Sequence, residues 1–187
     1  MMGQMMEPVV LPEPLALNEL PPRPWKLNGA DARPSKFIRS LLLDTTVEEA
    51  HNRKLFRKYE NIAGEIARAE TYMTSDANLI VVAYGTAARN ALIPIVLMGE
   101  MGAKVGLLRP ITLWPFPQHK VVELSRLVRH FLVFEMSTGQ MVEDIKLALN
   151  GRSNVHFYGR PGGIISTPDE IAREINSLYY RQHLEEE

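Results

Sequence analysis

The sequence predicts an α/β fold in which helices cover both faces of a mostly parallel sheet. From residue 78 onward, four short apolar segments alternate with four stretches of helical periodicity, which is the pattern of successive βαβ units. The length of 187 residues and the 45% hydrophobic content suit one ordinary domain with an arm left over. We therefore expect an arm over 1–35 and a single α/β domain over 36–187.

The predicted arm is rich in proline, which interrupts helices and interior strands. Its prolines are Pro8, Pro12, Pro14, Pro21, Pro22, Pro24 and Pro34. We expect an extended segment, with a short strand over 9–11 as an option, that becomes ordered where it docks on a partner.

A helix is predicted over 46–73, where Thr46 and Glu49 have the spacing of a capping box. Apolar side chains then recur at alternating steps of four and three residues, as in a narrow, heptad-like seam. The seam consists of Leu55, Tyr59, Ile62, Ile66, Ala69 and Met73. It favours a helix that packs on its own domain, with packing on a partner subunit, including a second copy, as the alternative. Gly64 lowers helix propensity by about 1 kcal/mol and suggests a close backbone approach.

The remaining elements follow from short apolar runs and helical periods. Strands are expected over 79–84, 104–108, 131–135 and 154–158, and helices over 86–101, 118–129, 138–149 and 167–181. The last helix has a well-formed start, with Thr167 as N-cap, Pro168 at the first helical position and Glu170 two residues later.

The carboxyl ends of these strands should meet at one edge of the sheet, where ligands of open parallel sheets usually bind. Thr86 and Arg89 follow the first strand, at a helix start that suits an anion, although no G-x-G-x-x-G fingerprint is present. Arg160 lies in a glycine-rich loop that serves either as an anion cradle or as a turn. Arg109 and Glu135 end two successive strands and would form an ion pair if these strands were neighbours, with phosphate or carboxylate binding by Arg109 as the functional alternative.

Trp114 and Phe116 alternate with prolines in a stiff loop after the second strand. Two aromatic side chains in such a loop suit burial in the home domain and a protein–protein interface equally well.

Composition excludes several classes of function. The chain has no cysteine, which excludes disulfides, cysteine nucleophiles and thiolate-bound clusters, and fits a cytoplasmic protein. A net charge of −1 without a basic cluster argues against nucleic acid, and no apolar run is long enough for a membrane span. Five dispersed histidines predict no metal site, and we expect no catalytic residue in this chain.

Three segments together resemble the C-terminal domain of the α subunit of 2-oxoacid:ferredoxin oxidoreductases, of the 2-oxoglutarate and 2-oxoisovalerate (ketoisovalerate) types. They are KVGLLRPITLWPFP at 104–117, FEMSTGQM at 134–141 and HFYGRPGG at 156–163, with a looser match of GQMMEP at 3–8. The resemblance implies a three-layer α/β/α fold like the transketolase C-terminal domain, in a chain that begins inside a longer subunit. Ser137 replaces the asparagine of the family, whereas Gly139 and Gln140 match, so Gln140 is a candidate domain contact.

The resemblance also implies what the parent complex does, namely oxidative decarboxylation of a 2-oxoacid to its acyl-CoA with reduction of ferredoxin. That complex would use thiamine diphosphate, magnesium, iron–sulfur clusters and coenzyme A, with a β subunit and further subunits as partners. This chain would brace the thiamine domain, assist assembly and be inactive alone. The alternatives are a module that binds coenzyme A or phosphate at the strand ends, and the equivalent domain of another thiamine-dependent enzyme.

Overall fold

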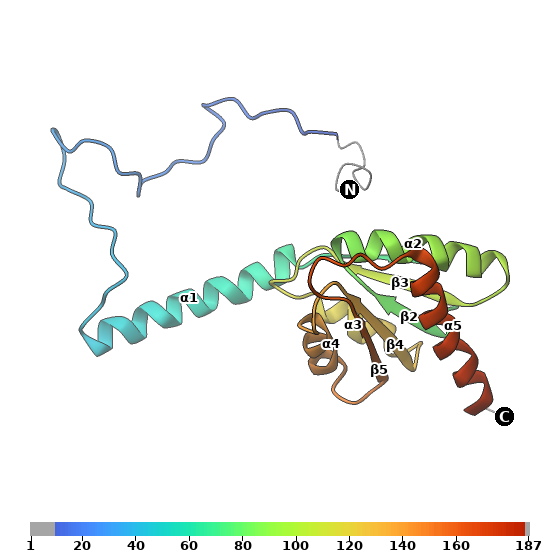
Figure 1. Ribbon diagram of the computed structural model, residues 1–187. Coiled ribbons are helices and arrows are strands. Elements are labelled where there is room, and N and C mark those ends of the chain that lie inside the picture. Colours follow the sequence, from blue (N-terminus) through green and yellow to red (C-terminus); the bar gives the residue numbers. More distant parts are fainter. Residues whose placement is uncertain (1–9, 186–187) are drawn as a thin grey trace. The chain divides into compact units, whose positions relative to one another are not determined.

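The computed structural model describes residues 10–185, so the segment 3–8 and residue 9 of the strand predicted over 9–11 lie outside the described residues. Contacts divide the chain into two units, residues 1–59 and 60–187, which we describe separately. The elements are shown along the chain in Figure 1.

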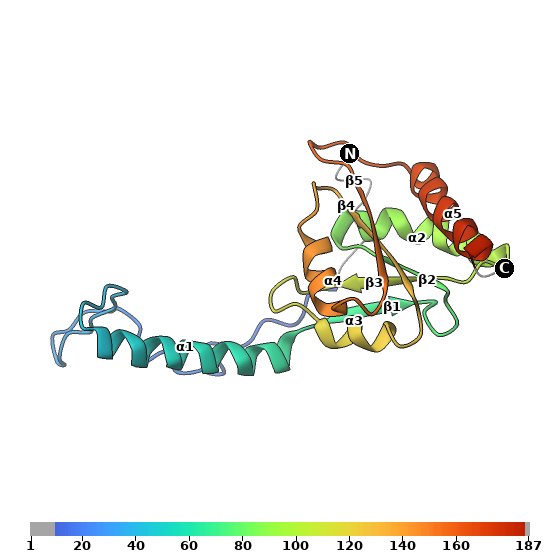
Figure 2. The ribbon, with the colours of Figure 1, turned by 90° about the horizontal axis from the view of Figure 1, so that it is seen from below.

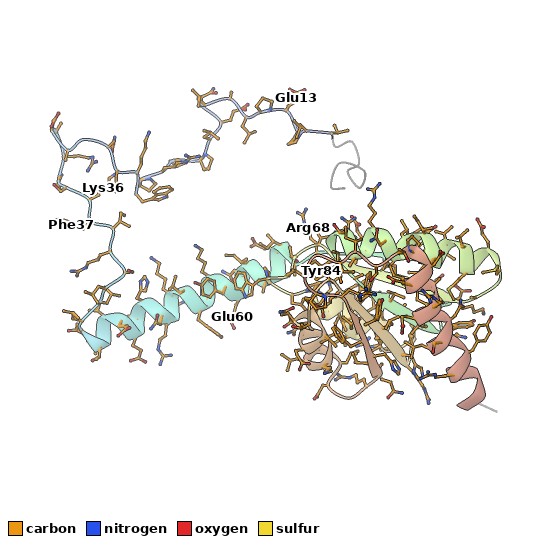
Figure 3. The ribbon with its side chains drawn as sticks, viewed as in Figure 1. Glu13, Lys36, Phe37, Glu60, Arg68 and Tyr84 are labelled. Carbon is orange, nitrogen blue, oxygen red and sulfur yellow. The ribbon has the colours of Figure 1, made fainter. Side chains whose placement is uncertain are left out.

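In the first unit, residues 10–44 form no helix or strand and expose most of their apolar side chains. Figure 3 shows Phe37, which is 86% exposed, on this segment. The segment is followed by helix α1 (Thr45–Ile66). The capping box predicted at Thr46 is wrong, because Asp44 caps the helix: its Oδ1 accepts hydrogen bonds from the backbone N–H groups of Thr46 (2.9 Å) and Val47 (3.1 Å) and from the Thr46 hydroxyl. These donors hold the pKa of Asp44 below its ordinary value, the Thr46 hydroxyl most of all.

The first helix ends earlier than predicted, and residues from the end of the predicted helix form a strand instead. Instead of reaching residue 73, α1 stops at Ile66, and β1 (Ala69–Tyr72) pairs antiparallel with β3 (Val105–Pro110). This pairing satisfies backbone groups at the edge of β3, and tertiary pairing here overrides the local helical period. Gly64 shows no close approach among the described residues, since a Cβ built there meets no atom within 4 Å.

The second unit contains a five-stranded sheet in the order β1-β3-β2-β4-β5. Strands β2 (Leu79–Val82), β4 (His130–Glu135) and β5 (Asn154–Gly159) run parallel to β3, so only β1 is antiparallel. The helices between and after these strands are α2 (Gly85–Glu100), α3 (Gln118–Leu124), α4 (Met141–Leu149) and α5 (Pro168–Glu185). The predicted order of strands and helices after residue 78 is confirmed.

Two layers of helices cover the sheet, as Figure 2 shows, with α2 and α5 on one face and α3 and α4 on the other. Alternate residues of the central strands serve the two cores: Leu79 and Val81 face α2 and α5, while Ile80 and Val82 face α3 and α4. All four side chains are fully buried, and each such burial contributes roughly 1.5–3 kcal/mol. The three-layer α/β/α arrangement is thus built on two apolar cores.

Helix α5 begins as its sequence predicts. The Thr167 hydroxyl accepts a hydrogen bond from the Glu170 backbone N–H (3.3 Å), and the Glu170 carboxylate accepts one from the Thr167 backbone N–H (3.1 Å). This reciprocal pair is a capping box, with Pro168 at the first helical position.

Candidate functional site

Parallel pairing brings the carboxyl ends of four strands to one edge, which we call the strand-end rim. It consists of residues 84–86 after β2, 109–110 on β3, 135–137 after β4 and 159–160 after β5. The chain passes from β2 through α2 to β3, which lies on one side of β2. It then passes from β3 through α3 to β4, which lies on the other side of β2. The topological switch point therefore lies between β2 and β4, where open α/β sheets place their ligands.

Arg109 is held by a neighbouring strand of the sheet edge. Glu70 lies opposite it in the β1–β3 ladder, and the Arg109 guanidinium donates to the Glu70 carboxylate at 3.1 Å. The ion pair expected between Arg109 and Glu135 is wrong, because β2 lies between β3 and β4. Both partners of the observed pair are about half exposed, so it contributes only about 0–1 kcal/mol.

Glu135 is fully buried and caps the start of α4. Its carboxylate accepts four hydrogen bonds at 2.9–3.2 Å, from the Ser137 hydroxyl and from the backbone N–H groups of Gln140, Met141 and Val142. The helix starts at Met141 rather than at residue 138, where the sequence predicted its start. A buried carboxylate that occupies a helix N-terminus leaves that terminus unavailable to an anionic ligand.

Arg160 is also engaged in the fold. Its guanidinium donates to the Glu170 carboxylate at 3.2 Å, which links the end of β5 to the start of α5. The Tyr158 hydroxyl and then the Glu170 charge raise the pKa of Arg160, whereas the pKa of Glu170 lies below its ordinary value. The main cause for Glu170 is the Thr167 N–H, with the Arg160 charge as a further contribution.

The two arginines lie far apart along the rim. Arg109 is on β3 and Arg160 follows β5, with β2 and β4 between them. Three strand spacings separate them by roughly 14 Å. Each guanidinium group is instead paired with its own glutamate, Arg109 with Glu70 and Arg160 with Glu170, so the structure does not gather them around one site.

The start of α2 is the part of the rim that combines the switch point with an uncapped helix. Tyr84, labelled in Figure 3, is the N-cap residue, and it makes no side-chain capping hydrogen bond. Gly85 has φ of +53°, a conformation that favours glycine. Thr86 is exposed and Arg89 is half-buried one turn later. Of the four rim candidates, Thr86 and Arg89 are therefore the two that the structure brings together.

The two aromatic candidates in the loop 111–117 differ in burial. Phe116 is half-buried against the core beneath α3 and α4, whereas Trp114 is 64% exposed. Thr112 anchors the loop, because its hydroxyl accepts a hydrogen bond from the Arg68 backbone N–H at 2.9 Å. The peptide bond between Trp114 and Pro115 is cis. The third interface candidate, Gln140, has an exposed side chain and lies beside Glu135 at the rim.

The residues present do not fit the metal-containing cofactors that the resemblance implies. Because the sequence has no cysteine, it supplies no thiolate to an iron–sulfur cluster. Within residues 10–185, no three or more His, Asp or Glu side chains gather to hold a metal ion. Over the same residues, we find no helix with the length and apolar character needed to cross a membrane.

The fold is shared with two solved structures. The 2-oxoglutarate:ferredoxin oxidoreductase from Magnetococcus marinus, solved with 2-oxoglutarate, coenzyme A and succinyl-CoA bound, matches with a TM-score of 0.62 at 17% identity, over 74% of this chain and 24% of that one. A split gene transketolase, described as an inactive beta4 tetramer, matches with a TM-score of 0.50 at 15% identity, over 60% of this chain and 41% of that one. The class is thus a three-layer α/β domain with the fold found in these two structures.

Sequence relatives are more specific. Residues 77–171, just over half of the chain, match the family described as pyruvate:ferredoxin oxidoreductase core domain II. The ketoisovalerate oxidoreductase subunit VorB of Methanothermobacter marburgensis is 38% identical over 177 residues, which are 95% of this chain and 50% of that protein. The 2-oxoglutarate synthase subunit KorA of the same organism is 30% identical over 138 residues, which are 72% of this chain and 37% of that protein.

The chain belongs to the 2-oxoacid:ferredoxin oxidoreductase family, as its sequence motifs predict. It spans about half the length of the VorB relatives that it matches.

Proposed function

We propose that this chain is a structural and assembly domain of the α subunit of a thiamine-dependent 2-oxoacid:ferredoxin oxidoreductase. The complex would convert a 2-oxoacid to its acyl-CoA and reduce ferredoxin, with the chemistry supplied by parts outside this chain. Family membership and the subunit names of its relatives support the parent reaction.

The observation that carries the proposal is the engagement of charged rim residues in the fold itself. Arg109 is paired with Glu70, Glu135 caps α4, and Arg160 is paired with Glu170. Side chains held in this way support the sheet edge and its helices rather than a reacting group. The exposed Trp114 and Gln140 supply surface for a neighbouring domain or subunit, because aromatic side chains are enriched in interface cores.

The partners in this proposal are a β subunit and the other subunits of the oxidoreductase, with a second copy of the chain as a further one. Thiamine diphosphate, magnesium, the iron–sulfur clusters and coenzyme A would bind to those other parts. The sequence expectation of a cytoplasmic location remains part of this proposal. Identity of 38% to a ketoisovalerate oxidoreductase subunit favours this family over transketolase or a 2-oxoacid dehydrogenase as the parent enzyme.

Calorimetry on the isolated chain tests the proposal. Titration with thiamine diphosphate and magnesium should give no saturable heat, and the chain should not turn over 2-oxoacids. Stoichiometric binding of thiamine diphosphate would show that this chain carries the catalytic site, and the assembly role would then be wrong.

A second candidate function is binding of the phosphate portion of coenzyme A at the start of α2. The uncapped helix N-terminus with Thr86 and Arg89 at the switch point favours it. Chemical-shift mapping with coenzyme A should then perturb the amides of residues 85–89. Unchanged amide shifts there at saturating coenzyme A would remove this candidate.

A further inference from the structure

Helix α1 carries a continuous apolar seam in which no side chain is fully buried. Leu55, Tyr59, Ile62 and Ile66 follow one another at steps of four, three and four residues, the spacing of core positions in a coiled coil. Tyr59 is 44% exposed, Ile66 is 43% exposed, and Leu55 and Ile62 are half-buried. Beside them, Phe56 is 64% exposed. The seam therefore has the pattern of a helix–helix interface.

The opposite side of the same helix is polar. The helical period places on that side the polar residues Arg53, Lys54, Arg57, Glu60 and Asn61, together with Gly64. Glu60 is labelled on α1 in Figure 3. Only one face of the helix is therefore suited to a partner.

Two charged residues flank the seam at equivalent heptad positions. Lys58 precedes Tyr59 and Glu65 precedes Ile66, so both lie on the same edge of the seam. They are roughly 10 Å apart along the helix axis and do not pair with each other. None of the ion pairs found over residues 10–185 includes Lys58 or Glu65, whereas Arg53 and Glu49 pair within the helix at 2.6 Å.

A second copy of α1 in the antiparallel direction matches both the apolar residues and the charges. With a two-fold axis between residues 60 and 61, Leu55 faces Ile66 of the second copy, and Tyr59 faces Ile62 of the second copy. The same register places Lys58 beside Glu65 of the second copy, and the symmetry repeats this pair. Phe56 then lies opposite the small side chain of Ala63 of the second copy.

Parallel pairing gives no such match. In a parallel pair, a residue preceding one core position lies beside the residue five positions later in the partner helix. Lys58 would then face Ala63 of the second copy, and neither charge would have a partner of opposite sign. Charge complementarity therefore selects the antiparallel arrangement.

We propose that α1 pairs antiparallel with α1 of a second copy, so that the chain forms a two-fold symmetric dimer through residues 55–66. This dimer would give the proposed assembly role a specific partner, and its biological meaning rests on that proposed function. The dimer is tested on the isolated chain without substrate or cofactor. The dimer can therefore be disproved while the oxidoreductase assignment stands, and the oxidoreductase assignment can be disproved while the dimer stands.

Charge reversal combined with sedimentation equilibrium tests the register. The unmodified chain should dimerise in a concentration-dependent way. Lys58→Glu and Glu65→Lys should each raise the dimer dissociation constant about tenfold, because each reversal places two like-charged pairs across the interface. The double variant Lys58→Glu/Glu65→Lys should restore the original dissociation constant, since the pairs are then attractive again.

Matched controls carry the same charge changes on the outer face of the helix. Arg57→Glu and Glu60→Lys should leave the dissociation constant unchanged, and circular dichroism should show that all variants keep their helix. A chain that stays monomeric at all concentrations, or a double variant as weak as the single variants, would overturn the proposal.

Cysteine cross-linking tests the direction of the helices independently. The chain has no natural cysteine, so introduced thiols react without background. Leu55→Cys/Ile66→Cys should give a disulfide-linked dimer under mild oxidation, because each cysteine faces the other type across the axis. The two positions are roughly 16 Å apart in one helix, too far for an intrachain disulfide.

The single variant Leu55→Cys provides the control. Antiparallel pairing keeps its two copies roughly 16 Å apart, so it should remain uncross-linked. Efficient cross-linking of the single variant would show parallel pairing and contradict the proposal, as would a double variant that does not cross-link.

Discussion

Glu135 holds the end of β4 against the start of α4 by accepting four hydrogen bonds in a fully buried position. Replacing it by alanine should lower the free energy of unfolding by about 3 kcal/mol, because three backbone N–H groups and the Ser137 hydroxyl lose their acceptor. Urea denaturation monitored by circular dichroism measures this loss.

Glu143 is the matched control on the same helix. Its carboxylate is exposed and pairs with Lys146 at 2.8 Å, so Glu143→Gln should cost less than about 0.5 kcal/mol. Equal losses in the two variants would show that the Glu135 hydrogen bonds do not stabilise the helix start.

The roles of single residues were predictable where the interaction is local. Thr167 and Glu170 are three residues apart, and their sequence spacing alone predicts the capping box. The partner of Arg109 depends instead on the order of strands in the sheet, which the sequence pattern does not contain. Glu135 had one local signal, a carboxylate two residues before a serine–threonine–glycine helix start, but its burial depends on packing against α4.

At the scale of elements, the start of α5 should make stability depend on pH. The folded-state pKa of Glu170 lies below its ordinary value of 4.5, chiefly because of the Thr167 N–H. Its contribution is therefore complete above about pH 4.5 and is lost as pH falls through the folded-state pKa. The difference in unfolding free energy between the unmodified chain and Glu170→Gln should shrink over that acidic range.

Urea denaturation at a series of pH values measures this difference. Glu174→Gln, on an exposed position of the same helix, controls for the loss of one negative charge. A Glu170 effect that stays constant down to the lowest pH at which the chain folds would contradict the assignment.

Elements with a clear period and local start signals were predicted well from the sequence. The four parallel strands and their helices fall within a few residues of their predicted positions, except for α3, which ends at Leu124 rather than at residue 129. The missed strand β1 has a physical explanation: Ala69 and Met73 continue the heptad spacing of α1, so the local pattern favoured helix. Pairing with β3 decided the outcome, and that contact joins residues far apart in the sequence.

For the whole molecule, the interactions at the strand-end rim support the proposed assembly role. Its arginines are separated by two strands and paired with glutamates, and one helix start is filled by Glu135. In the proposed assembly role, the exposed Trp114 and the seam of α1 would each supply surface for a partner. The sequence identified the family through three motifs, whereas the engagement of the rim residues required the fold.

Purification of the tagged chain from the cells that produce it is the sharpest test of the proposed assembly role. Mass spectrometry and a 2-oxoacid assay with coenzyme A and an artificial electron acceptor would follow one gentle affinity step. We expect stoichiometric co-purification with a thiamine-binding polypeptide and 2-oxoacid oxidation in the eluate, while the chain separated from its partners is inactive. A chain that elutes alone, or one that oxidises 2-oxoacids after separation, would contradict it.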